Sequence, residues 1–148
     1  MRIRSTCLSV AMVIGVLGLV GCTTAVGPDD DDRLYQALGE RQGIDRLVDD
    51  LLFRISEDAR IVDQFDGIDV NRFQRTLSEQ ICEISGGPCE YSGDDMVTVH
   101  RGRDISEASF NALVENLQDA MEHQNVPVAA QNRLLRKLAD MRAEVIHL

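Results

Sequence analysis

Residues 70–88 read VNRFQRTLSEQICEISGGP. Apolar side chains recur in this stretch every three or four residues, which is the spacing of one face of an α-helix. Two glycines and a proline follow, and they end a helix because glycine terminates helices readily and proline cannot continue one. The stretch therefore predicts an amphipathic helix over residues 70–84 and a sharp turn after it. The apolar face consists of Val70, Phe73, Leu77, Ile81 and Ile84.

Helical spacing continues on both sides of this segment. Ser106 before Glu107 is typical of a helix start, and Pro127 suits the first turn of another helix. No run beyond the N-terminal segment alternates apolar and polar residues between turn signals, so a sheet is not expected. A chain of 148 residues has room for one domain, which we predict to be compact and all-α. Further helices are expected over residues 32–38, 43–57, 96–101, 106–121 and 127–145.

The N-terminal segment has the features of a secretory signal. Arg2 and Arg4 precede an uncharged apolar run over residues 7–20, which is shorter than the roughly 20 residues of a permanent membrane helix. The run ends in LVGC at residues 19–22, which resembles the lipobox of bacterial lipoproteins. In that class the chain is cut before the cysteine, which then carries the lipid. A plain cleaved signal with a chance cysteine is the alternative interpretation.

The lipobox resemblance implies an extracytoplasmic protein, anchored by lipid to a bacterial membrane and facing the periplasm. Thr23 follows the cysteine, where an aspartate would indicate the inner membrane, so the outer membrane is favoured. The acidic run from Asp29 to Asp32 is expected to be solvated and not a metal site. We therefore expect residues 1–21 to be a cleaved signal peptide, 22–33 a flexible tether that starts at the lipidated Cys22, and 34–148 the folded domain.

Charge and missing motifs exclude several classes of function. The formal net charge is −10, and an acidic surface repels phosphate backbones, so nucleic acid is not expected as a partner. The sequence contains no phosphate-binding G-x-x-x-x-G-K-[ST] loop and no G-x-G-x-x-G. It also lacks the G-x-S-x-G turn that exposes a nucleophilic serine, so a serine hydrolase is not supported.

Two of the four cysteines remain for the folded domain, since Cys7 lies in the signal and Cys22 would carry the lipid. Cys82 and Cys89 flank a short loop with two glycines, and an extracytoplasmic compartment permits disulfides. We expect them to form a structural disulfide that stabilises the fold by about 2–3 kcal/mol. A redox-active pair is the alternative, although the spacing differs from the C-x-x-C of thiol oxidoreductases.

The three histidines differ in their surroundings. His123 and His147 have polar or terminal neighbours and are expected at the surface, whereas Met96 lies one helical turn before His100 on the same apolar face. A histidine on such a face is more often a core residue than a ligand. A zinc site would need further ligands at suitable spacing, and the absence of C-x-x-C-H excludes covalently attached haem. A lone histidine between apolar helix faces remains compatible with non-covalent haem.

Several short motifs follow one another at set distances along the chain. LYQALG at residues 34–39 matches an L-Y-x-x-L-G opening, and QFDG at 64–67 matches F-F-x-G with its second phenylalanine kept. GGP at 86–88, YSG at 91–93 and M-x-x-x-H at 96–100 match a G-G-P, Y-T-G, M-x-x-x-H series. The order and spacing of these motifs resemble the group I truncated haemoglobins from Leu34 to about Ile146. Lesser matches are LVDD at 47–50, ISEASF at 105–110 and VP at 126–127.

This resemblance implies a truncated globin fold, in which a two-over-two helical sandwich surrounds one non-covalent haem b with one iron. It implies His100 as the proximal iron ligand and the gases O2, NO and CO as binding partners. Arg72, Thr76, Arg101 and Arg103 are candidates for holding the haem propionates. When the haem-contacting positions of the family are transferred to this sequence one by one, the expected haem pocket consists of Phe65, Phe73, Leu77, Ile81, Met96, Val99, His100, Ile105, Phe110 and Leu113.

The positions beside the gas ligand depart from the family. Members usually have a phenylalanine-tyrosine pair at Leu51 and Leu52, where the tyrosine donates a hydrogen bond to the gas, and often a glutamine at Leu77. The distal pocket is then expected to consist of Leu51, Leu52, Leu77 and Thr76, with Thr76 and Gln80 as the only polar neighbours. A charge-assisted hydrogen bond contributes about 1.5–3 kcal/mol. We therefore predict weak retention of O2 and relatively favoured binding of NO or CO.

The sequence leaves open whether the protein catalyses a reaction. One alternative to a gas-binding haem protein is an NO-detoxifying or redox haem enzyme, which would need a redox partner that the sequence does not identify. Another is a lipoprotein that kept the globin scaffold for an interaction or structural role and lost haem.

Overall fold

A computed structural model of the chain describes residues 30–147, and among these it contains α-helices and 3-10 turns but no strand. The predicted all-α fold is confirmed. The signal peptide, Cys22 and residues 22–29 of the tether lie outside the described residues. The elements are α1 (Asp30–Ala37), α2 (Glu40–Glu57), η1 (Val62–Phe65), α3 (Val70–Ile84), α4 (Met96–His100), α5 (Glu107–His123), α6 (Val128–Asp140) and η2 (Arg142–Glu144).

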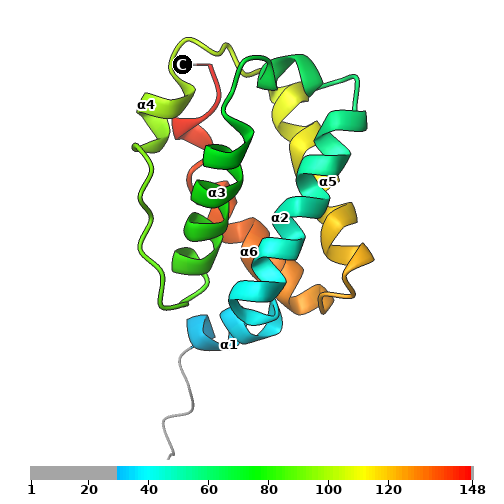
Figure 1. The fold of residues 1–148 in the computed structure, drawn as a ribbon, viewed down its shortest axis with the longest axis vertical. Coiled ribbons are helices and arrows are strands. Elements are labelled where there is room, and N and C mark those ends of the chain that lie inside the picture. The colour runs from blue at the N-terminus through cyan, green and yellow to red at the C-terminus, as the bar shows by residue number, and fades with distance from the viewer. Residues whose placement is uncertain (1–29, 148) are drawn as a thin grey trace, which may run out of the picture.

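Helix α2 lies at the centre of the fold, between α3 and α5 (Figure 1). Helix α6 packs against α5, and α1 packs against α2 and α6 at the lower end in this view. The short helix α4 lies at the outer edge beyond α3, close to η2 near the C-terminus. The helices pack on a core of buried aliphatic side chains that includes Leu34, Ile44, Leu47, Val48, Met121 and Leu134.

Side chains just ahead of three helices fix where these helices begin. Asp69 accepts a hydrogen bond from the backbone of Arg72, and Asp95 does the same for Thr98 at 2.9 Å. Ser106 accepts from the backbone of Ser109, as expected for the predicted cap. Each bond satisfies a backbone N–H that has no partner within the helix. The third helix runs over residues 70–84, as its apolar spacing predicted.

The predicted ends of the first and last helices need correction. Helix α1 begins at Asp30, two residues before the expected start, inside the segment assigned to the tether. The last helix ends at Asp140 and does not reach Val145. From Met141 the chain tightens, because the backbone N–H of Glu144 bonds to the carbonyl of Met141 in the manner of a 3-10 turn. This turn directs Ile146 into the protein, where it is buried.

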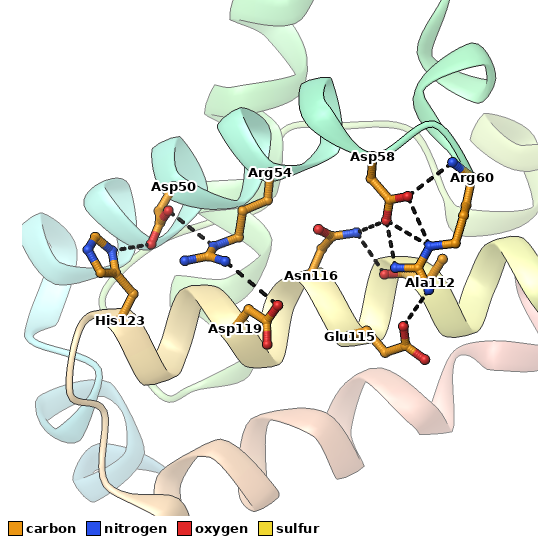
Figure 2. A network of polar contacts seen from close by, with 9 residues as sticks. All are labelled: Asp50, Arg54, Asp58, Arg60, Ala112, Glu115, Asn116, Asp119 and His123. Carbon is orange, nitrogen blue, oxygen red and sulfur yellow. Dashed lines mark hydrogen bonds and ion pairs between the residues drawn. The ribbon is translucent and has the colours of Figure 1, made fainter.

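A polar network joins α2 to α5 (Figure 2). Asp58, directly after α2, accepts hydrogen bonds from the side chains of Arg60 and Asn116, and Arg60 also pairs with Glu115. These hydrogen bonds hold the pKa of the Asp58 carboxyl well below its usual range, with the side chain of Arg60 as the largest cause. The network therefore fixes the chain where it leaves α2.

The predicted disulfide is present. It joins Cys82 near the end of α3 to Cys89 in the loop before α4, with the two Cα atoms 5.8 Å apart. Among residues 30–147 no helix has both the length and the apolar character needed to span a membrane. Within the same range no group of three His, Cys, Asp or Glu side chains is arranged to hold a metal ion.

Candidate functional site

A largely apolar cavity of about 510 Å³ lies between α3, α4, α5 and the C-terminal turn. Its volume is in the range of pockets for small molecules and cofactors. The aromatic rings of Phe65 and Phe73 lie 5.5 Å apart on its wall. All ten side chains that the family pattern assigned to a haem pocket line this cavity: Phe65, Phe73, Leu77, Ile81, Met96, Val99, His100, Ile105, Phe110 and Leu113.

The imidazole of His100 is oriented by its own helix. Helix α4 begins after Asp95, and one turn later the Nδ1 atom of His100 lies 2.8 Å from the carbonyl oxygen of Met96. A carbonyl can only accept a hydrogen bond, so Nδ1 carries the proton and donates it. The lone pair of the neutral ring is therefore on Nε2, the atom that a metal would use.

Burial favours this neutral form. The side chain of His100 is partly buried in the cavity wall, and desolvation is the main reason why its pKa lies below the usual value. The positive charge of Arg103 lowers the pKa further, while the hydrogen bond to Met96 opposes the shift. A neutral imidazole with a free lone pair, next to an apolar cavity, has the chemistry of an iron ligand.

The opposite wall of the cavity is apolar, but one predicted residue is not part of it. Leu51, Leu77 and Thr76 line the cavity, whereas Leu52 does not and packs against the core. The Thr76 hydroxyl donates to the carbonyls of Arg72 and Phe73 in its own helix. Of the four residues expected in the distal pocket, Leu52 is thus the one that the structure does not place in the cavity lining.

Two of the three arginines proposed for the haem propionates lie at the cavity. Arg72 and Arg103 both line it, while Arg101 does not and is exposed. Arg72 pairs with Asp94 at 3.1 Å near the surface, and Nε of Arg103 donates to the carbonyl of Val99 at 2.9 Å. Of the four propionate candidates, Arg72, Arg103 and Thr76 therefore lie at the cavity. Arg101 follows α4 directly and points elsewhere.

The cavity also contains side chains that the family pattern did not assign. Gln80 reaches two methionine sulfurs there, with Nε2 at 3.3 Å from Met96 and 3.6 Å from Met141. The sequence indicated Gln80, with Thr76, as a polar neighbour of the distal positions, and its place three residues after Leu77 on the same helix agrees with this. Met141, directly after α6, lines the cavity together with Leu138 on that helix. The additional polar or flexible lining residues are Gln64, Asp69, Gln80, Tyr91, Ser109 and Met141.

A globin-like arrangement thus emerges from the fold and the cavity, and the comparisons with known proteins agree. The sequence profile of the bacterial-like globin family matches residues 33–147, and the chain belongs to this family. The chain is 27% identical over 112 residues to the group 1 truncated hemoglobin GlbN of Mycolicibacterium paratuberculosis. The matched region covers 76% of this chain and 82% of that protein.

Two further proteins are similar to this chain, one in sequence and one in structure. The chain is 26% identical over 114 residues to the group 1 truncated hemoglobin GlbN of a Nostoc species, covering 77% of this chain and 97% of that protein. The crystal structure of truncated hemoglobin from Tetrahymena pyriformis, Fe(III) form, superposes with a TM-score of 0.74 at 22% identity, over 76% of this chain and 97% of that chain. This structural similarity supports the fold.

Proposed function

We propose that this protein binds one haem non-covalently in the cavity, through Nε2 of His100, and binds a diatomic gas. The observation that carries the proposal is the oriented, neutral imidazole of His100 in the wall of an apolar cavity of about 510 Å³. Haem would supply an iron with one position for His100 and one for O2, NO or CO. The similar proteins of Mycolicibacterium paratuberculosis and Nostoc are named hemoglobins, which supports the same assignment.

The side chains around the cavity have separate roles in this proposal. Phe65 and Phe73 offer aromatic faces for a planar macrocycle, and the hydrogen bond from His100 to Met96 keeps the imidazole in one tautomer and one orientation. Arg72 and Arg103 would pair with the propionates, because guanidinium groups match carboxylates in charge and geometry. The residues present therefore fit haem.

The wall opposite His100 supports weak retention of O2. Leu51, Leu77 and Phe73 carry no polar hydrogen. The Thr76 hydroxyl already donates to its own helix, and the Gln80 amide already reaches the sulfurs of Met96 and Met141. A donor next to the gas would favour O2 more than NO or CO, since O2 gains most from a hydrogen bond in a globin pocket. We infer that this pocket discriminates against O2 relative to members of the family that have such a donor.

Absorption spectra test haem binding directly. The purified protein should bind added haem with a Soret band, and ferrous and CO-bound spectra should report a single histidine ligand. His100→Ala should lose or strongly shift this band, whereas His123→Ala should not. His123 is the matched control because its side chain is 71% exposed and its Nδ1 atom bonds to Asp50. A protein without a Soret band after haem addition, or an unchanged band in His100→Ala, would instead favour a scaffold that has lost haem.

We also propose that the chain is lipid-anchored outside the cytoplasm. The support is the LVGC sequence at residues 19–22 and the disulfide between Cys82 and Cys89, since disulfides persist mainly in oxidising compartments. Metabolic labelling with a radioactive fatty acid should mark the wild-type protein in a bacterial host, and Cys22→Ser should abolish the label. Labelling that survives in Cys22→Ser, or a protein that fractionates with the cytoplasm, would contradict this proposal.

A further inference from the structure

The two sulfurs of the disulfide have unequal surroundings. Cys82 is fully buried, and a side chain at Gly87 would place its Cβ atom 2.6 Å from the Cys82 sulfur and from the Tyr35 ring. Gly87 and Tyr35 therefore cover the Cys82 sulfur closely. Cys89, in the loop between α3 and α4, is partly exposed. A reagent in solution can reach the sulfur of Cys89 far more easily than that of Cys82.

A positive charge lies beside the accessible sulfur. Nη1 of Arg41, on α2, donates to the sulfur of Cys89 at 3.7 Å. The other edge of the guanidinium is occupied, because Nε bonds to the two carboxylate oxygens of Asp45 at 3.0 and 3.1 Å. The backbone N–H of Arg41 donates to the Tyr35 hydroxyl, so Arg41 and the ring that covers Cys82 are linked. In the reduced pair, this cation would stabilise the thiolate of Cys89, the form that reacts.

We propose that Cys82 and Cys89 form a thiol–disulfide exchange site in which Cys89 is the nucleophile, Arg41 stabilises its thiolate, and the reactant is an oxidising disulfide. The thiolate of Cys89 attacks one sulfur of the oxidant, whose other sulfur leaves as a thiolate. Cys82, as a thiolate, then attacks the Cys89 sulfur of this mixed disulfide and expels the second half of the oxidant. The pair loses two electrons, and the oxidant is reduced to two thiols.

The difference in exposure between Cys82 and Cys89 also makes the disulfide between them slow to be reduced. A reducing thiol can reach only Cys89, and its attack must expel Cys82 as a thiolate into the apolar core. A buried, unpaired charge is costly, and Arg41 contacts the other sulfur. Once formed, the bond therefore opens reluctantly.

The closed bond lies next to the cavity. Ile81, directly before Cys82, and Tyr91, two residues after Cys89, both line the cavity wall. The loop is also held on α3 by Glu83, which accepts from the Tyr91 backbone at 3.2 Å, and by Glu79, which accepts from Ser92. Exchange at Cys89 therefore fixes the segment that leads to α4. The exchange chemistry itself does not depend on haem.

Reaction with glutathione disulfide tests the assignment of the nucleophile. In the full chain with Cys7→Ser and Cys22→Ser, adding Cys82→Ser leaves only Cys89, and adding Cys89→Ser leaves only Cys82. Mass spectrometry of the reduced proteins over time should show the glutathione adduct forming at least about tenfold faster on Cys89. Equal rates, or a faster reaction of Cys82, would overturn the proposal.

Arg41 is tested in the background that keeps only Cys89. Arg41→Gln should slow adduct formation about three- to tenfold, and Arg41→Lys should restore part of the rate, since both charge and reach matter. Arg46→Gln is the matched control, because Arg46 lies on the same helix and is exposed. If Arg41→Gln reacts as fast as Arg46→Gln, Arg41 has no part in the reaction.

A second measurement avoids variants that lack one cysteine of the pair. The reduced Cys82/Cys89 protein is exposed briefly to glutathione disulfide, quenched with acid, alkylated and digested. The captured mixed disulfide should be on the peptide that contains Cys89. Capture on the Cys82 peptide would contradict the proposal even if the single-cysteine variants fold poorly.

Discussion

The two walls of the cavity are held in place by different means. The wall formed by α3 packs along the central helix α2, and its Ile81 is 1% exposed and belongs to the hydrophobic core. The wall formed by α4 is a helix of five residues at the edge of the molecule (Figure 1), positioned by the Asp95 cap and by the loop before it. One wall therefore contributes to the stability of the whole fold, while the other mainly sets the geometry of the site.

Truncating one aliphatic side chain on each wall gives the strongest test of this contrast. Ile81→Ala should lower the free energy of unfolding by about 2–5 kcal/mol, because it removes buried atoms and leaves a cavity. Val99→Ala, on the half-buried wall of α4, should cost about 1 kcal/mol or less. Urea unfolding followed by circular dichroism measures both values. Equal losses in the two variants would show that α4 is as much a part of the core as α3.

The disulfide links the two walls, so removing it should give the next largest effect. Replacing Cys82 and Cys89 by serine should lower the free energy of unfolding by about 2–3 kcal/mol, chiefly because the unfolded chain loses a constraint. Adding a reductant to the wild-type protein should cause the same loss, and adding it to the double variant should cause none. A double variant as stable as the oxidised protein would mean that the loop before α4 holds its place without the bond.

Local signals made most of the fold and the His100 wall predictable. Helical spacing, the Ser106 cap and the Gly86–Gly87–Pro88 stop act over a few residues, and the helices formed close to the predicted bounds. The hydrogen bond from His100 to Met96 spans four residues, so its geometry also follows from the helix. The end of the last helix was not predictable in this way, because the chain changes to a 3-10 turn after Met141 and buries Ile146 against other parts of the fold.

The opposite wall depended on helix phase and on contacts between distant parts of the chain. The family pattern pointed to both Leu51 and Leu52, but only Leu51 lines the cavity. The approach of Arg41 to Cys89 joins residues 48 positions apart, which no short motif encodes. Sequence reasoning therefore brought Leu51, Leu77 and Thr76 to the cavity but did not separate Leu51 from its neighbour Leu52.

Introducing a donor on the apolar wall tests its proposed effect on gas binding. If haem binds as proposed, Leu77→Gln should slow the release of O2 about tenfold, since a new hydrogen bond of about 1.4 kcal/mol changes a rate by that factor. Leu52→Gln is the matched control, because the same change at a residue outside the cavity should leave the rate unchanged. Stopped-flow measurement of O2 dissociation gives both rates. Slower release in Leu52→Gln but not in Leu77→Gln would reverse the assignment of the two leucines.

The smallest expected effect is a pH-dependent change in stability at the polar network between α2 and α5, far from the α4 wall. Because its partners hold the folded-state pKa of Asp58 below the usual value, its carboxylate stabilises the fold at neutral pH, and this contribution is lost as the pH falls through the folded-state pKa. Asp58→Asn should therefore be less stable than wild type at pH 7, and the difference should shrink below about pH 4.

Thermal unfolding of both proteins at several pH values measures this difference. Asp119→Asn is the control on the same network (Figure 2), because its carboxylate is 64% exposed and lies 3.7 Å from Arg54, so it should change stability little at any pH. A difference between wild type and Asp58→Asn that stays constant down to pH 2 would show that the Asp58 side chain acts through shape and neutral hydrogen bonds. A difference that closes on acidification, with no such trend for Asp119→Asn, would show that its charge anchors the end of α2.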